Sequence, residues 1–162
     1  MLIAMLSWLL AIPLLGVTTG LRAMTPMAVL CWFAYLGYLP VQNTWAAWTA
    51  SVAAVAAFTV LALAEIVADK LPRIPDRFSE APLMARLFFG GLIGSIAATA
   101  MAGPGLEGVL LGVVGAALGA FAGFMIRREL VERIGCPDWM VALVEDLIAV
   151  ACAGFAMHVV TN

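Results

Sequence analysis

Five ionisable side chains lie in or beside otherwise apolar stretches of the sequence, and they are the groups best suited to bind or move charge. They are Arg22, Glu65, Asp69, Glu145 and Asp146. Glu65 and Asp69 are four residues apart and therefore share one face of a helix. A charge is costly to bury unless it meets a partner. We therefore expect the five groups to converge.

The types of these groups suit proton exchange, cation binding or the binding of an anion. Crowded carboxylates in a poorly hydrated site hold protons more readily than isolated ones. Arg22 lies just before Thr25 and Pro26, which mark a helix start whose free backbone amides favour an anionic partner. Three interpretations stay open. Arg22 pairs with one acid while the others fix helix packing, or the five form a transport or ligand site, or they form a catalytic site.

The composition assigns the chain to a membrane. Hydrophobic residues make up 65% of its 162 residues and charged residues only 11%, whereas a soluble domain carries about 25% charged residues. This excludes a soluble enzyme and a disordered tail. The net charge of −2 also lacks the basic footprint of a nucleic-acid-binding protein. We expect the lipid bilayer as partner, no nucleic acid and no cofactor, and the sequence leaves metal binding undecided.

The apolar runs predict an all-α, polytopic membrane helical bundle of about six transmembrane helices, in one domain that spans residues 1–162 and has no soluble part. A helix needs about 20 apolar residues to cross the bilayer core. The predicted spans are residues 2–19, 25–39, 45–67, 83–102, 108–126 and 138–160. The second is the shortest, so we expect it to be tilted, half-inserted or broken. The five charges would then lie in the inner third of the membrane.

The basic residues predict the orientation of the chain. All eight fall on one face of this arrangement. Seven follow the first, third or fifth predicted span, namely Arg22, Lys70, Arg73, Arg77, Arg127, Arg128 and Arg133, and Arg86 lies near the end of the third loop. Short loops rich in Lys and Arg stay in the cytoplasm. We therefore expect a multi-pass protein with both termini outside the cytoplasm.

Glycines on the fifth predicted span form a surface for close helix packing. Gly115, Gly119 and Gly123 recur every four residues, which lets another helix backbone approach this face. Two interpretations stay open. The 83–102 and 108–126 helices pack against each other within one chain, or the stripe is the surface of a homodimer.

Three short motifs occur in an order and spacing typical of one family. They are Gly20-Leu21-Arg22 followed by Pro26, then Glu65-x3-Asp69-Lys70-x-Pro72, and finally Glu145-Asp146 with apolar flanks. In these motifs the sequence resembles a family of small bacterial integral membrane proteins, domain of unknown function 4126. The resemblance covers nearly the whole chain and implies a helical protein of the bacterial inner membrane. It implies no activity.

Three functions fit these features. We favour a small transporter or channel, as a homo-oligomer, whose acid and arginine site takes a cation, a proton or a small ionic solute. The alternative is a non-catalytic membrane scaffold or assembly partner that uses the glycine faces. A less favoured option is an enzyme on lipid phosphates, with the acids holding Mg²⁺. The sequence lacks the signature motifs of such enzymes, so we assign no catalytic residue.

Overall fold

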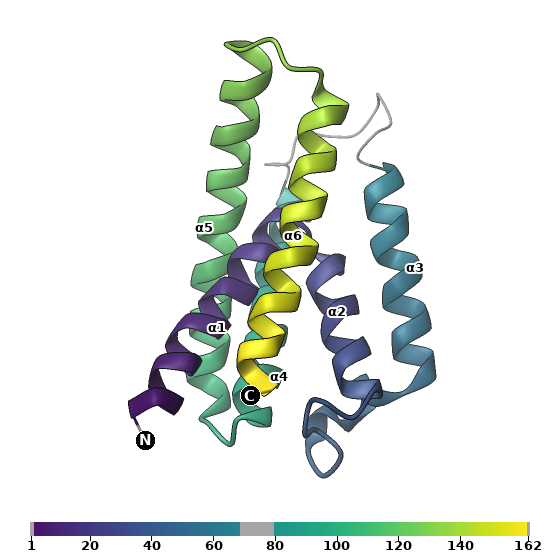
Figure 1. Ribbon diagram of the computed structural model, residues 1–162, viewed down its shortest axis with the longest axis vertical. Coiled ribbons are helices and arrows are strands. Elements are labelled where there is room, and N and C mark those ends of the chain that lie inside the picture. The colour runs from purple at the N-terminus through teal and green to yellow at the C-terminus, as the bar shows by residue number, and fades with distance from the viewer. Residues whose placement is uncertain (1, 69–79, 162) are drawn as a thin grey trace.

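The computed structural model describes residues 2–68 and 80–161, and these residues form helices joined by turns, without a strand (Figure 1). The helices are α1 (Leu2–Leu21), α2 (Met24–Tyr35), the 3₁₀ helix η1 (Trp45–Ala50), α3 (Val52–Ala68), α4 (Glu80–Ala100), α5 (Gly105–Glu132) and α6 (Asp138–Thr161). The prediction of an all-α bundle is confirmed. The start of α1 and the end of α6 lie at the same end of the bundle (Figure 1).

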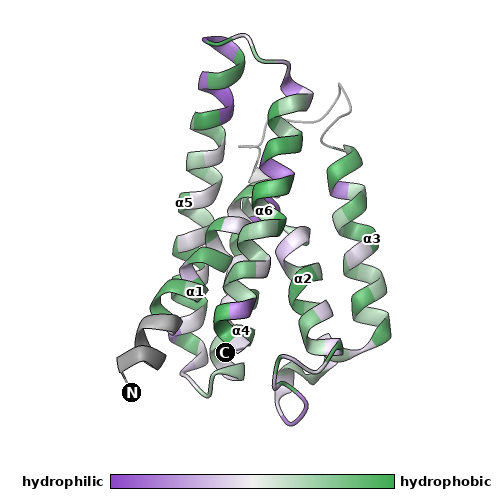
Figure 2. Ribbon diagram, viewed as in Figure 1, coloured by the Kyte–Doolittle hydropathy of each residue, from purple (hydrophilic) through white to green (hydrophobic). Residues whose placement is uncertain are grey.

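The helices are those of a membrane protein. Within the described residues, three segments are long and apolar enough to cross a bilayer, namely Pro82–Ala100, Gly105–Glu132 and Asp138–Thr161. Three shorter apolar helices accompany them, namely Trp8–Leu21, Met24–Tyr35 and Val52–Ala68. Large apolar side chains on α4, α5 and α6 point away from the bundle, as lipid-facing residues do. Hydrophilic residues gather where α5 meets the α5–α6 connection (Figure 2).

The helix in the second predicted span, α2, is shorter than predicted, because a glycine ends it early. Gly37 has a φ of +81°, and its amide donates to the carbonyl of Ala34 while that of Tyr38 donates to Phe33. This pair of bonds is the Schellman arrangement that closes a helix. The 12 residues of α2 extend about 18 Å, whereas the bilayer core is about 30 Å thick. The predicted end at residue 39 is therefore wrong.

The third predicted span is divided in two. Thr44 caps η1 by accepting a hydrogen bond from the amide of Ala46 at 3.2 Å. Ser51 then caps α3 by accepting one from the amide of Ala54 at 3.1 Å. Two hydroxyl caps seven residues apart favour a separate first turn over one continuous helix. The predicted span of residues 45–67 is thus η1 followed by α3.

Helix α5 forms the centre of the packing, with α4 on one side and α1 on another. A Cβ atom at Gly112 would meet the backbone of Gly90 and Gly94 on α4. One at Gly115 would lie 2.5 Å from the carbonyl oxygen of Pro13 on α1. The three helix backbones are therefore in direct contact, which small residues permit inside a bilayer.

The glycine stripe packs against α1 and not against α4. A Cβ atom at Gly119 would meet the carbonyl of Val17, and one at Gly123 would lie 2.7 Å from the side chain of Leu21. Helix α4 is contacted instead through glycines one and two turns earlier on α5. The 83–102 and 108–126 helices do pack against each other within one chain, as predicted, and the Gly115–Gly119 part of the stripe packs against α1. Because α1 covers Gly115 and Gly119, this stripe is not an open surface for a second copy.

Candidate functional site

The connection between α1 and α2 is a buried turn and not a surface loop. It consists of Arg22 and Ala23, which are 1% and 5% exposed. In Figure 1 the end of α1 and the start of α2 lie partway along the lengths of α5 and α6, and the burial of both residues places the turn inside the bundle. The amide of Arg22 still donates to the carbonyl of Thr18 at 2.8 Å, so α1 runs directly into the turn. The sequence analysis grouped Arg22 with the basic residues of the loops. The structure corrects this, because Arg22 is buried in the turn.

The start of α2 is capped by a carboxylate from α3. The two oxygens of Glu65 accept hydrogen bonds from the amides of Ala23 and Met24, each at 2.9 Å. The N-cap residue, Ala23, provides no side-chain cap, and Thr25 lies inside the first turn of α2. A carboxylate at a helix N-terminus meets both free amides and the positive end of the helix dipole. Glu65 is thus the anionic partner expected at this helix start.

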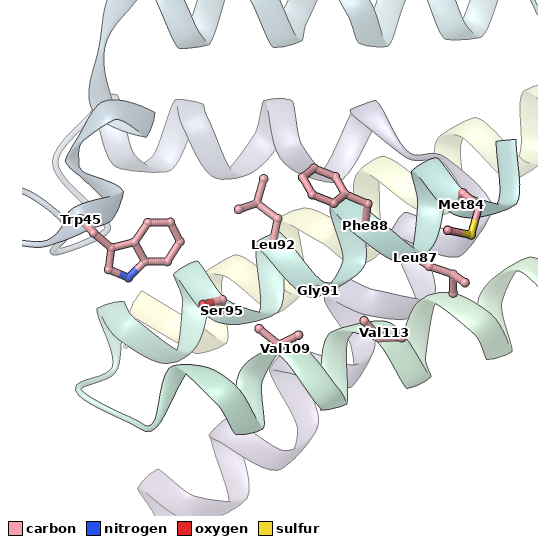
Figure 3. Close-up of a pocket in the computed structure, with 9 residues that line it drawn as sticks. All are labelled: Trp45, Met84, Leu87, Phe88, Gly91, Leu92, Ser95, Val109 and Val113. Atoms are coloured by element: carbon pink, nitrogen blue, oxygen red, sulfur yellow. The ribbon is translucent and has the colours of Figure 1, made fainter. Parts of the chain in front are cut away.

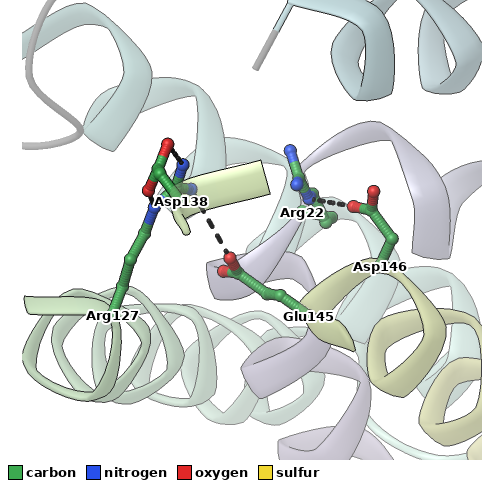
Figure 4. A network of polar contacts seen from close by, with 5 residues as sticks. All are labelled: Arg22, Arg127, Asp138, Glu145 and Asp146. Atoms are coloured by element: carbon green, nitrogen blue, oxygen red, sulfur yellow. Dashed lines mark hydrogen bonds and ion pairs between the residues drawn. The ribbon is translucent and has the colours of Figure 1, made fainter. Parts of the chain in front are cut away.

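Arg22 forms an ion pair with Asp146 on α6. Its Nε atom lies 2.6 Å from Oδ1 of Asp146, and the Asp146 side chain is 12% exposed (Figure 4). Asp146 follows Trp139 by seven residues, or about 10 Å along the helix axis. If Trp139 marks the membrane interface, as tryptophan commonly does, the pair lies well inside the apolar layer.

The neighbouring acid, Glu145, faces α5. Its side chain is 9% exposed, and Oε2 lies 3.8 Å from an outer nitrogen of Arg127. Arg127 also donates two hydrogen bonds of 2.6 Å to the two oxygens of Asp138, the first residue of α6 (Figure 4). The two adjacent acids on α6 therefore contact two different arginines, Arg22 in the α1–α2 turn and Arg127 on α5.

The structure brings together four of the five predicted residues and adds two. Arg22, Glu65, Glu145 and Asp146 meet around the α1–α2 turn, with Arg127 and Asp138 beside them at the end of α5. Asp69 lies outside the described residues. Sequence analysis missed the Arg127–Asp138 pair, although Arg127 ends the apolar part of α5 and Asp138 begins α6 after a short connection. Opposite charges at the facing ends of two consecutive helices were the signal from which this pair could have been predicted.

These six residues, which we name the polar cluster, carry a surplus of acid. It contains four carboxylates and two guanidinium groups. Such a set can accept protons or a cation, and its arginines hold the acids in place. Among the described residues, no group of three or more His, Cys, Asp or Glu side chains is arranged to hold a metal ion.

Comparison with known proteins gives the family of the chain. The model of the family described as domain of unknown function (DUF4126) matches residues 9–161. The chain belongs to this family. The DUF4126 match contains every residue of the polar cluster. No curated protein and no solved structure matches the chain.

This DUF4126 chain also has a groove of about 500 Å³ between α4 and α5. Figure 3 shows its lining, which contains the indole of Trp45, the ring of Phe88 and the hydroxyl of Ser95. None of the lining residues is ionisable, so the groove offers no group for acid–base or ion chemistry.

Substitution of Glu65 tests its role at the start of α2. In Glu65→Gln, the amide side chain keeps one acceptor oxygen and loses the charge. We expect a loss of about 1–2 kcal/mol at this helix end, which corresponds to roughly 5- to 30-fold faster hydrogen exchange at the amides of Ala23 and Met24. Exchange elsewhere in α2 provides the internal control. Unchanged protection of these two amides would contradict the cap.

Proposed function

We propose that this chain is a small transporter or channel of the bacterial inner membrane, and that the polar cluster binds the proton, cation or small ionic solute that it moves. One observation carries the proposal. The helical path breaks at Arg22 and Ala23 inside an apolar bundle, and charged groups from α3 and α6 meet at that break.

Broken helices inside a membrane are typical of transport sites. Their ends supply partial charges and backbone groups that can hold an ion or a charged solute. Here the end of α1 and the start of α2 lie on either side of the Arg22 turn, and Glu65 occupies the amides of α2. An ion or proton that neutralises Glu65 would weaken its hold on these amides and so couple binding to a movement of α3.

The Arg22–Asp146 pair also favours a functional role over packing alone. Replacing a buried ion pair with apolar residues of similar volume is often neutral or stabilising. Stability by itself therefore does not require a guanidinium that is 1% exposed. Ionisable groups at such a depth commonly mark ion or proton pathways.

The charge of the cluster favours a proton or a cation over an anion. Its carboxylates outnumber its guanidinium groups by two. An anion would have to displace an acid from Arg22 or from the amides of α2. A proton or a cation instead reduces the repulsion among the acids.

The orientation with both termini outside the cytoplasm remains part of this proposal. Arg127, Arg128 and Arg133 lie at one end of α5, whereas the start of α1 and the end of α6 lie at the other end of the bundle (Figure 1). A basic end favours the cytoplasmic side.

The proposal also includes self-association of the chain. Helix α3 buries only Ala54, Val55 and Ala62, which leaves its other faces to lipid or a second copy.

Flux into proteoliposomes tests the proposal. We expect wild-type protein to carry protons or monovalent cations, and Asp146→Asn to reduce this flux about tenfold or more, the change that corresponds to about 1.4 kcal/mol. Glu107→Gln is the matched control, since Glu107 is an exposed acid in the first turn of α5. Equal flux in wild type and Asp146→Asn, or no flux above empty liposomes, would contradict the proposal.

A membrane scaffold or assembly partner is the second candidate, and the groove between α4 and α5 favours it. The groove is apolar and lies on the surface of the bundle, so a helix of another membrane protein could pack there. Absence of flux together with one stoichiometric partner in purified material would favour this function over transport.

A further inference from the structure

We propose that the start of α2 is a binding site for a small monocarboxylate anion, and that the carboxylate of Glu65 occupies this site as a tethered competitor. The inference rests on the proposed function, because it names the ionic solute that the polar cluster takes together with a proton. The donors of the site are two backbone amides and the hydroxyl of Thr25.

The backbone at the start of α2 already holds a carboxylate at two points. The amides of Ala23 and Met24 each donate a hydrogen bond of 2.9 Å, and each bond goes to a different oxygen of Glu65. Amides at a helix start lack a helical acceptor and lie at the positive end of the helix dipole, which favours an anion. Two acceptor oxygens on one carbon are a property of a carboxylate and not of a halide. The bound side chain therefore shows the shape of the ligand that fits.

A buried hydroxyl without a partner lies in the same turn of the helix. Thr25 is 5% exposed, and its Oγ1 atom has no hydrogen-bond partner among the residues that the structure describes. Other described threonines, such as Thr18 and Thr19, donate to a carbonyl three or four residues earlier. For Thr25 those residues are Leu21 and Arg22, which lie across the break in the helical path. A buried hydroxyl of this kind gains free energy from a ligand that accepts its proton.

The side chain of Thr25 leans toward the two amides. The Cα–Cβ bonds of a helix tilt toward its N-terminus, and Thr25 is the second residue of α2. A ligand on the amides of residues 23 and 24 therefore lies on the side to which this hydroxyl is directed. The hydroxyl can donate to an anion as the amides do. Three neutral donors thus converge at one end of α2.

The charges around the site indicate why the anion requires a proton. Helix α2 has no Asp, Glu, Lys, Arg or His, and the nearby charged groups are Arg22 in the turn, Asp146 bound to it and the adjacent Glu145 on α6. Asp69 lies outside the described residues. An anion added beside ionised Glu65 would be repelled, whereas a proton on Glu65 weakens its hold on the amides. The anion then restores the negative charge that the proton removed, which a dianion would not do.

Rescue by acetate tests the site. Glu65→Ala removes the tethered carboxylate, and we expect sodium acetate near saturation to slow hydrogen exchange at the amides of residues 23 and 24 by about tenfold and to raise the unfolding midpoint. The full chain is measured in detergent micelles at neutral pH. Sodium chloride and sodium sulfate at the same ionic strength should have little effect. Wild type should also change little, because its own carboxylate fills the site.

The hydroxyl has a separate test. In the Glu65→Ala background, Thr25→Val keeps the shape of the side chain and should weaken the binding of acetate roughly 2- to 10-fold. Thr19→Val is the matched control, because Thr19 is also buried and its hydroxyl already donates to the carbonyl of Leu15. Equal acetate affinity in Thr25→Val and Thr19→Val would remove Thr25 from the site and overturn the inference.

The outcomes separate this inference from the proposed function. If Glu65→Ala does not fold, the same titration is decisive in Glu65→Gln, whose neutral side chain is easier to displace. No acetate effect in the folded variant, or an equal effect of chloride, of sulfate or in wild type, would overturn the inference. Rescue by acetate without any flux in wild-type proteoliposomes would support the site and overturn transport. Proton or cation flux without rescue would leave transport standing.

Discussion

Gly119→Ala is expected to destabilise the chain strongly, whereas Gly154→Ala leaves it as stable or more stable. A Cβ atom at Gly119 would overlap the carbonyl oxygen of Val17 and lie 2.8 Å from its Cα and carbonyl carbon. These are backbone atoms, so no rotamer change relieves the overlap and α1 has to move away from α5. Overpacking of this kind costs about 1–3 kcal/mol. Unfolding midpoints in detergent micelles provide the measurement.

Gly154 is the matched control, because nothing lies within 4 Å of a Cβ atom added there. Alanine is favoured over glycine in a helix by about 0.8–1.0 kcal/mol, so this variant should unfold at an equal or higher temperature. The loss in Gly119→Ala should not depend on protein concentration, since α1 of the same chain covers the site. Equal midpoints for the two variants, or a loss seen only on dilution, would contradict the intramolecular contact.

The sequence predicts the helices well, because an apolar environment leaves the backbone few other ways to satisfy its hydrogen bonds. The start of α6 after Pro137 and the positions of α4 and α5 follow from this rule and from turn residues. The lengths of α2 and α3 do not. They depend on Gly37, Thr44 and Ser51, whose local hydrogen bonds end or restart a helix within apolar stretches. An average over hydropathy does not register such bonds.

The candidate site is predictable only in part, for a related reason. The cost of burying charge indicates that Arg22 meets one of the acids, and in the structure this acid is Asp146 on α6. The partners of Glu65 are the backbone amides of residues 23 and 24. Every residue except proline has such an amide, so the residue types do not reveal this contact. Arg127 and Asp138 occupy helix ends, where charged residues are commonly solvated, so their pairing next to Glu145 required the packing of α5 and α6.

Removing one partner of the Arg22–Asp146 pair should cost more stability than removing both. In Arg22→Met or Asp146→Leu the remaining charge stays buried with one ion pair fewer, and the expected loss is about 3–5 kcal/mol. The double variant replaces the pair with apolar side chains and should recover most of that loss. A double-mutant cycle on the free energy of unfolding measures the coupling. The exposed Arg128–Glu132 pair is the control, with an expected coupling of about 0.3–0.5 kcal/mol.

The double variant also separates the two interpretations of the polar cluster. If Arg22 and Asp146 serve the binding of an ion, a chain that folds without them should lose flux even though its stability is restored. If the pair only fixes helix packing, the same variant should carry flux like the wild type. Losses that simply add in the double variant would show that the two side chains do not act as a pair. The comparison distinguishes these roles because stability and flux are measured on the same folded protein.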